Sequence, residues 1–125
     1  MHSIIQTQAA PAAIGPYSQA VVAGDMVFAS GQLGLDPITG EMKGADLAAQ
    51  AQQALTNLKA VLEAADCGID HVTAVDVYLV DMNDFAEFNA IYETFFDNHK
   101  PARAVVAVKA LPKNGLVEIK CIARR

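Results

Sequence analysis

Tryptophan is absent from this chain of 125 residues, and aromatic residues make up only 6% of it. Charged residues are also few, at 18%, whereas hydrophobic residues reach 53%. This composition excludes an intrinsically disordered chain, which would combine low hydrophobicity with high charge. It predicts one folded domain over residues 1–125, with a core built mainly from Ala, Val, Ile and Leu.

Basic clusters and metal-ligand motifs are lacking as well. The net charge is −5, and the only pair of adjacent basic residues is Arg124-Arg125, so a nucleic-acid partner is not expected. The two cysteines, Cys67 and Cys121, are far apart, and no histidine spacing suits zinc. We expect two reduced packing thiols, with no metal and no organic cofactor.

Long hydrophobic runs are also missing. No segment approaches the length of a membrane span, and the N-terminus lacks the basic region and apolar stretch of a signal peptide. These features predict a cytoplasmic protein without membrane contact.

Six strands are predicted from alternating and β-branched segments. The second and third form a hairpin around the turn Gly24-Asp25, and a glycine-rich loop follows over residues 31–44. The strands are expected at residues 4–5, 18–23, 26–30, 72–80, 103–108 and 116–123.

Two helices are predicted from apolar residues at helical spacing. The first begins after the N-cap Asp46 and stops at Gly68. The second begins near Asp84, which forms a capping box with Glu87, and ends before Pro101. Its apolar stripe consists of Phe85, Phe88, Tyr92 and Phe95.

The element order is therefore β-β-β-α-β-α-β-β, an α+β fold in which the helices can cover only one face of a mixed sheet. Strand 104–108 is nevertheless apolar on both sides. An apolar face that no helix covers requires a partner chain, so we expect a homo-oligomer whose sheets pack against one another.

Two charged residues interrupt the apolar strands near the C-terminus: Arg103 and Glu118. Charged side chains are rarely buried unless they are paired or take part in chemistry. A guanidinium group matches a carboxylate in shape and charge, so Arg103 is a candidate anion receptor. A structural Arg103–Glu118 ion pair, or an arginine that reaches solvent from a strand end, explains the pattern equally well.

A series of ordered segments resembles the Rid family (reactive intermediate deaminases, also called YjgF-like proteins). The resemblance runs nearly from end to end. Its segments are AIGPYSQA at 13–20, SGQ at 30–32, the 36–41 loop, NDF at 83–85, Asn89, Tyr92, Phe95-Phe96, PAR at 101–103, LP at 111–112 and VEI at 117–119.

This resemblance implies a chorismate-mutase-like (ferredoxin-like) sheet with two helices on one face. It also implies a homotrimer with a barrel-like sheet core and a ligand cleft at each subunit interface. The implied activity is hydrolysis of reactive 2-imino acids or enamines, such as 2-aminoacrylate, 2-iminobutanoate and 2-iminopropanoate, to 2-keto acids and ammonia. Because these intermediates escape from pyridoxal-phosphate enzymes and harm others, the implied role is metabolite damage control in amino-acid metabolism.

The resemblance also implies catalytic roles for three residues. Arg103 would bind the substrate carboxylate, Glu118 would hold or activate the hydrolytic water, and Tyr17 would contact the substrate or close the cleft. A carboxyl group in an apolar wall favours its protonated form, which suits proton transfer near neutral pH. The alternative for Tyr17 is a turn aromatic packed on Pro16.

Three further positions match substrate-binding residues of the family: Ser30, Gly31 and Asn89. Each has a structural alternative. Ser30 can simply end a strand, Gly31 can be a loop glycine, and Asn89 can face solvent rather than a cleft.

Val105 departs from the family pattern, because many members carry a cysteine two residues after the arginine. A thiol-dependent mechanism at this position is therefore excluded, whereas attack by water needs no thiol.

Other functions remain open from the sequence. A non-catalytic sensor of keto acids or related carboxylates would use the same arginine, although it would not need Glu118. An endoribonuclease or translation inhibitor is disfavoured by the acidic pI near 4.9. A chaperone would need a large apolar patch, which the oligomer interface should cover.

Overall fold

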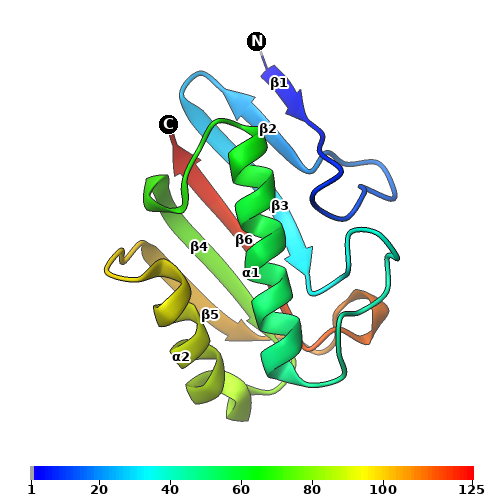
Figure 1. Cartoon of the computed structure of the whole chain (residues 1–125). Helices are drawn as coiled ribbons and strands as arrows, with labels where there is room; N and C mark the ends of the chain where they lie inside the picture. Colours follow the sequence, from blue (N-terminus) through cyan, green and yellow to red (C-terminus); the bar gives the residue numbers. More distant parts are fainter. Residues whose placement is uncertain (1) are drawn as a thin grey trace.

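The computed structural model describes residues 2–125, and the predicted element order is confirmed (Figure 1). The strands are β1 (His2–Ile5), β2 (Ala20–Ala23), β3 (Met26–Leu33), β4 (Val72–Leu79), β5 (Ala102–Ala107) and β6 (Val117–Arg124). The helices are α1 (Leu47–Ala64) and α2 (Phe85–Phe96), with short 3-10 turns η1 (Ile69–His71), η2 (Met82–Asp84) and η3 (Pro112–Asn114).

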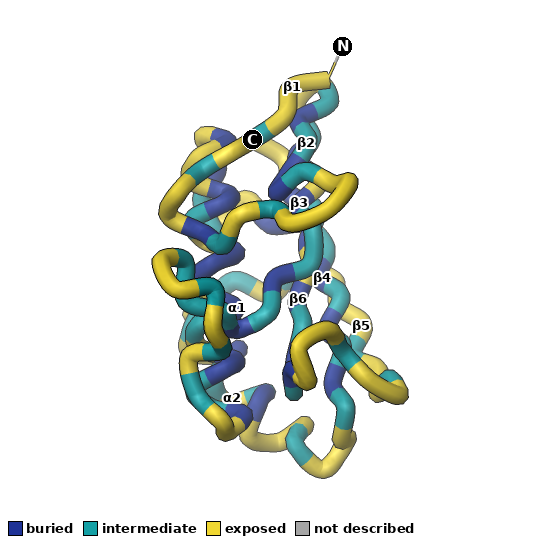
Figure 2. Tube along the Cα trace, turned by 90° about the vertical axis from the view of Figure 1, so that its right-hand side faces the viewer, coloured by how far each residue is buried: buried dark blue, intermediate teal, exposed yellow. Residues whose placement is uncertain are grey.

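The strands form one mixed sheet in the order β1-β2-β3-β6-β4-β5. Only β4 and β5 pair in parallel, and β5 is an edge strand. Both helices lie on the same side of the sheet (Figure 2), so the core fills the layer between them and the strands. The α+β class, the mixed sheet and the single helical layer are thus as predicted.

Helix α1 begins where the sequence predicts, because the Asp46 side chain accepts a hydrogen bond of 2.8 Å from the backbone N–H of Ala49. Its end was predicted wrongly. The helix stops at Ala64, and Asp66 rather than Gly68 takes the left-handed conformation (φ 58°) that commonly follows a helix end. An aspartate tolerates this conformation better than most residues, which a glycine-based rule does not register.

The capping box predicted for α2 is wrong. Asp84 has the helical conformation (φ −80°, ψ −4°), and its side chain caps no backbone N–H of the helix. Asp81 starts the preceding turn η2 instead, accepting a hydrogen bond of 2.9 Å from the N–H of Asn83. The apolar stripe also differs, because Phe96 is buried whereas Phe85 is exposed.

The hairpin turn is confirmed, and Gly24 has the left-handed φ of 63° that such a turn requires at its first position. The loop predicted from residue 31 begins too early, because β3 continues to Leu33. Between the pairs Ala29↔Cys121 and Gln32↔Ile119, β3 has two residues, Ser30 and Gly31, where β6 has one. This β-bulge explains why a strand with an internal glycine resembles a loop in the sequence.

One face of the sheet has no helix on it. In β6, Val117, Ile119, Cys121 and Ala123 are buried on the helical side, whereas Glu118, Lys120, Ile122 and Arg124 alternate with them on the other. Exposed apolar side chains on this open face include Phe28 and Val106, at 44% and 46% exposure. Within residues 2–125, neither helix is long and apolar enough to span a bilayer.

Candidate functional site

Arg103 lies at the sheet edge on the helical side. In the register of the sheet it is level with Val75 of β4, and Val75 is level with Cys121 of β6. Both neighbours are buried beneath the helices. Because β5 has no further strand beside it, the arginine stands at the rim of the molecule and is exposed.

Helix α2 holds the guanidinium group of Arg103 in place. Nη1 donates a hydrogen bond of 2.7 Å to Oδ1 of Asn89, and the guanidinium carbon lies 4.7 Å from the ring centroid of Tyr92. The ring of Phe85 is 5.8 Å away. A cation over aromatic faces is stabilised by the ring quadrupole, so the group is pre-oriented, and its other N–H donors have no partner among residues 2–125. Asn89 therefore faces Arg103 rather than only solvent.

Tyr92 and Phe85 gain a role that the sequence pattern does not give them. Tyr92 and Phe85 lie three and four residues from Asn89, so all three share one side of α2. This spacing is the feature of the sequence that could have linked them to the site. The Tyr92 hydroxyl is buried without a hydrogen-bond partner, and burial raises its pKa to about 12. The phenol thus stays neutral beneath the arginine.

Glu118 lies in an open cleft of about 780 Å³ on the opposite face of the sheet. The cleft is also lined by Tyr17, Ser30, Gly31 and Lys120. Partial burial raises the pKa of the Glu118 carboxyl above its ordinary value, because the charged form loses hydration. A carboxyl group with a raised pKa accepts a proton more readily than an ordinary carboxylate and can return it.

The bulge in β3 makes room for this carboxyl group. A Cβ atom at Gly31 would stand 2.9 Å from Cδ and 3.0 Å from Oε2 of Glu118. The glycine therefore lets the carboxyl group lie directly against the backbone of the bulge. Bulges are frequent beside active sites because they redirect side chains and backbone groups.

Tyr17 lies on the loop before β2 and is 53% exposed. The Ser30 hydroxyl donates a hydrogen bond of 2.6 Å to the carbonyl of Ser18, and the Ser30 N–H donates one of 2.9 Å to the carbonyl of Gln19. Ser30 thus ties the bulge to the loop that carries Tyr17. Its hydroxyl proton is used in this contact.

The predicted residues therefore fall into two groups. Arg103 and Asn89 line a cavity of about 250 Å³ under α2, whereas Tyr17, Ser30, Gly31 and Glu118 line the cleft on the open face. No lining residue is common to the two. An Arg103–Glu118 ion pair within one chain, the structural alternative, is therefore wrong. Sequence spacing could not show this, because the relative faces depend on the register between strands.

The two cysteines are buried packing residues, as predicted. Burial raises the pKa of Cys121 to about 12 and also raises that of Cys67, so both favour the neutral thiol. Cys121 faces the helical side, away from Glu118. In the described part of the chain, no group of three or more His, Cys, Asp or Glu side chains is arranged to hold a metal ion.

Comparison with known sequences identifies relatives over almost the full length. The sequence model of the family described as Endoribonuclease L-PSP matches residues 7–125. A 2-iminobutanoate/2-iminopropanoate deaminase of Bos taurus is 48% identical over 123 residues, which cover 98% of this chain and 90% of the relative.

Solved structures give the same result for the fold. A putative endoribonuclease L-PSP from Entamoeba histolytica superimposes with a TM-score of 0.98 at 46% identity, covering 100% of both chains. The structure of E. coli TdcF with bound serine has a TM-score of 0.94 at 46% identity and covers 98% of each chain. The relatives share the fold but carry different functional names.

Proposed function

The chain belongs to the Rid family (YjgF/RutC, or endoribonuclease L-PSP), and from this premise we propose that it hydrolyses 2-imino acids to 2-keto acids and ammonia. The observation that carries the proposal is the pre-oriented guanidinium of Arg103, held by Asn89 and Tyr92 with donors left for a carboxylate. Several mammalian relatives at about 48% identity are named 2-iminobutanoate/2-iminopropanoate deaminase. The substrates would include 2-aminoacrylate, 2-iminobutanoate and 2-iminopropanoate.

In this mechanism Arg103 binds the substrate carboxylate through two parallel hydrogen bonds and fixes the adjacent C=N bond. Glu118 takes a proton from a water molecule while the oxygen of that water attacks the imine carbon. The C–O bond forms, the π electrons of the C=N bond move to nitrogen, and Glu118 passes the proton that it took from water to this nitrogen. For an enamine, a proton is first added to the terminal carbon.

The resulting carbinolamine then collapses. Its hydroxyl proton passes to Glu118, the C=O bond forms, and the C–N bond breaks to release ammonia, so one water is consumed for each keto acid. Glu118, with its raised pKa, returns a proton to the departing nitrogen. Tyr17, at the mouth of the cleft, donates a hydrogen bond to the substrate or covers it. The backbone at Gly31 binds the substrate at close range, and Val105 provides no thiol.

Because Arg103 and Glu118 lie on opposite faces of the sheet, a working site needs two chains. Arg103 stands on the edge strand β5, so a neighbour whose open face packs against this edge brings its own Glu118 to the arginine. The exposed Phe28 and Val106 on the open face support such packing. We therefore include in the proposal a homotrimer with a barrel-like sheet core and a cleft at each interface.

The experiment couples a pyridoxal-phosphate dehydratase that releases 2-aminoacrylate to this protein. Keto-acid formation is followed in competition with a nucleophile that traps the imine. Acceleration over buffer, lost in Arg103→Ala, is the expected result. Binding of 2-keto acids without acceleration would instead identify a carboxylate sensor. A protein that neither accelerates keto-acid formation nor binds 2-keto acids would refute the proposal.

A further inference from the structure

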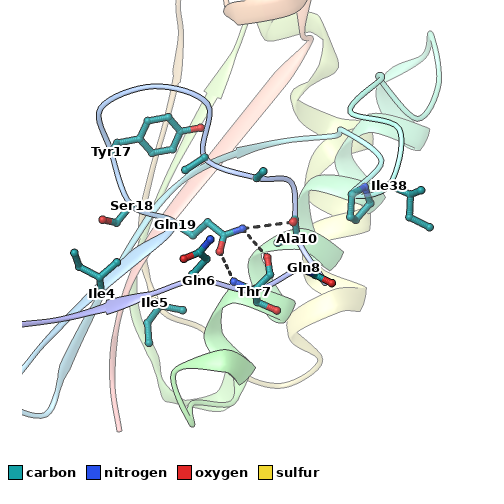
Figure 3. Close-up of a pocket in the computed structure, with 13 residues that line it drawn as sticks. Ile4, Ile5, Gln6, Thr7, Gln8, Ala10, Tyr17, Ser18, Gln19 and Ile38 are labelled. Atoms are coloured by element: carbon teal, nitrogen blue, oxygen red, sulfur yellow. Dashed lines mark hydrogen bonds between the residues drawn. The ribbon is translucent and has the colours of Figure 1, made fainter.

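A second cavity, of about 860 Å³, lies beside the Glu118 cleft and shares Tyr17 with it. It is bounded by β1, by the loop that follows it and by Pro37-Ile38 (Figure 3). The most buried polar side chain in its wall is that of Gln19, which is 3% exposed. Gln19 comes directly before β2, two residues after Tyr17.

The amide of Gln19 is bonded on both of its ends to the loop that carries Tyr17. Its Oε1 accepts a hydrogen bond of 2.7 Å from the N–H of Thr7, and its Nε2 donates to the carbonyls of Thr7 (3.0 Å) and Pro11 (2.8 Å). Nε2 also lies 3.4 Å from the carbonyl of Ala10. Figure 3 shows this side chain reaching across the base of the loop.

This loop has little else to hold it. Residues 12–17 are mostly exposed and contain no helix or strand, and Ile14 at its tip is 81% exposed. Ser30 also contacts the carbonyls of Ser18 and Gln19, Ala10 is buried in the core, and the N–H of Tyr17 donates a hydrogen bond of 2.9 Å to the carbonyl of Gly15 within the loop. The position of Tyr17 over the cleft therefore depends on a few hydrogen bonds near the two ends of the loop.

We propose that Gln19 is a positioning residue, which acts on the reaction by holding Tyr17 over the cleft of Glu118. This inference rests on the proposed function and deepens it. The chemistry requires an amide here, because one end of the side chain must accept from an N–H while the other donates to carbonyls. A carboxylate fits the first contact and is repelled by the carbonyls at the second.

The test compares Gln19→Glu with Gln19→Met and with the control Gln8→Glu. Gln8 lines the same cavity, is exposed and has no side-chain hydrogen-bond partner among residues 2–125. Displacement of Tyr17 by Gln19→Glu should lower kcat/KM by about 10- to 100-fold near pH 8, whereas Gln8→Glu should stay close to wild type. Gln19→Met loses the bonds without adding charge, so its smaller loss should not depend on pH.

Lower pH should restore the activity of Gln19→Glu, which it would not do if the substitution caused a general folding defect. Burial should raise the pKa of a glutamate at position 19, and its protonated form can donate one hydrogen bond. The activity of Gln19→Glu relative to wild type should therefore recover as pH falls from about 8 to about 5.5. Among the described residues that line the cavity, Tyr17 is the only one with a titratable side chain. Glu118 in the adjoining cleft is present in wild type and in Gln8→Glu as well, so activity is compared with both at each pH.

A double-mutant cycle shows whether Gln19 acts through Tyr17. In a Tyr17→Phe background, Gln19→Glu should reduce kcat/KM by less than about threefold, because the group it positions is already lost. Equal effects in both backgrounds would overturn the proposal, as would a Gln19→Glu enzyme that matches Gln8→Glu at every pH.

Hydrogen exchange separates failure of this inference from failure of the proposed function. Backbone amides of residues 7–17 should exchange faster in Gln19→Glu than in Gln8→Glu, and this readout needs no activity. An inactive wild type with that exchange pattern would refute the deaminase assignment but not the hold of Gln19 on the loop. Unchanged exchange would refute the claim that Gln19 fixes this loop, whatever the activity.

Discussion

Arg103 and Glu118 owe their properties to opposite kinds of surroundings. The arginine is exposed but held in one orientation by its hydrogen bond to Asn89 and by the ring of Tyr92 beneath it. The glutamate is partly buried and has lost part of its hydration, which raises the pKa of its carboxyl group. One side chain is thus prepared to bind an anion and the other to exchange protons.

Arg103→Lys keeps the positive charge but removes the planar fork. We expect kcat/KM to fall about 100-fold or more, because a lysine cannot make two parallel hydrogen bonds to a carboxylate. The melting temperature should change little, since residue 103 is exposed. Arg124→Lys is the matched control, because Arg124 is exposed and pairs with Asp25 at 2.8 Å, away from both clefts. Full activity of Arg103→Lys would contradict the anchor role.

Glu118→Gln should lower kcat more strongly than it raises KM, because it removes proton transfer and leaves the arginine in place. It should also change how stability depends on pH. Since the pKa of Glu118 is raised above 4.5, the folded protein binds more protons than the unfolded chain just above that pH. The free energy of unfolding therefore falls as pH rises through the folded-state pKa.

The glutamine variant should lack this fall and be at least as stable as wild type at neutral pH. Urea unfolding at a series of pH values measures it. Glu63→Gln, on the exposed side of α1, serves as the activity control. A Glu118→Gln variant that loses stability at neutral pH would show that the carboxylate is stabilised in the folded state, contrary to the account.

At the scale of elements, the sequence predicts the strands and helices well because their patterns are local. It fails where a special conformation replaces the pattern. Asp66 ends α1 in place of Gly68, and the bulge at Ser30-Gly31 resembles a loop. The site is less predictable than the fold, since the faces occupied by Arg103 and Glu118 depend on pairing between strands that are distant in sequence.

The two helix starts make a matched pair for testing this view. Asp46 caps α1 through a hydrogen bond of 2.8 Å to Ala49, whereas the Asp84 side chain caps nothing in α2. Asp46→Ala should therefore cost about 1 kcal/mol of stability, and Asp84→Ala only a few tenths of that, from the helix dipole. Chemical denaturation of both variants checks this, and equal losses would show that the cap geometry does not decide the stability.

At the scale of the whole molecule, the proposed site is divided between the two faces of one sheet. The helical layer covers one face, and the other carries Phe28, Val106 and the Glu118 cleft without a cover from the same chain. Self-association would bury these apolar side chains and join the arginine of one chain to the glutamate of the next. Assembly and activity should therefore be lost together.

The most direct test mixes two inactive variants. Arg103→Ala and Glu118→Gln chains are unfolded, combined in equal amounts and refolded, and imine hydrolysis is measured against each variant refolded alone. In a ring where each cleft takes Arg103 from one chain and Glu118 from its neighbour, random mixing restores about a quarter of the clefts. Recovery of about a quarter of wild-type activity is the predicted result. A mixture no more active than its two components would contradict a site built between chains.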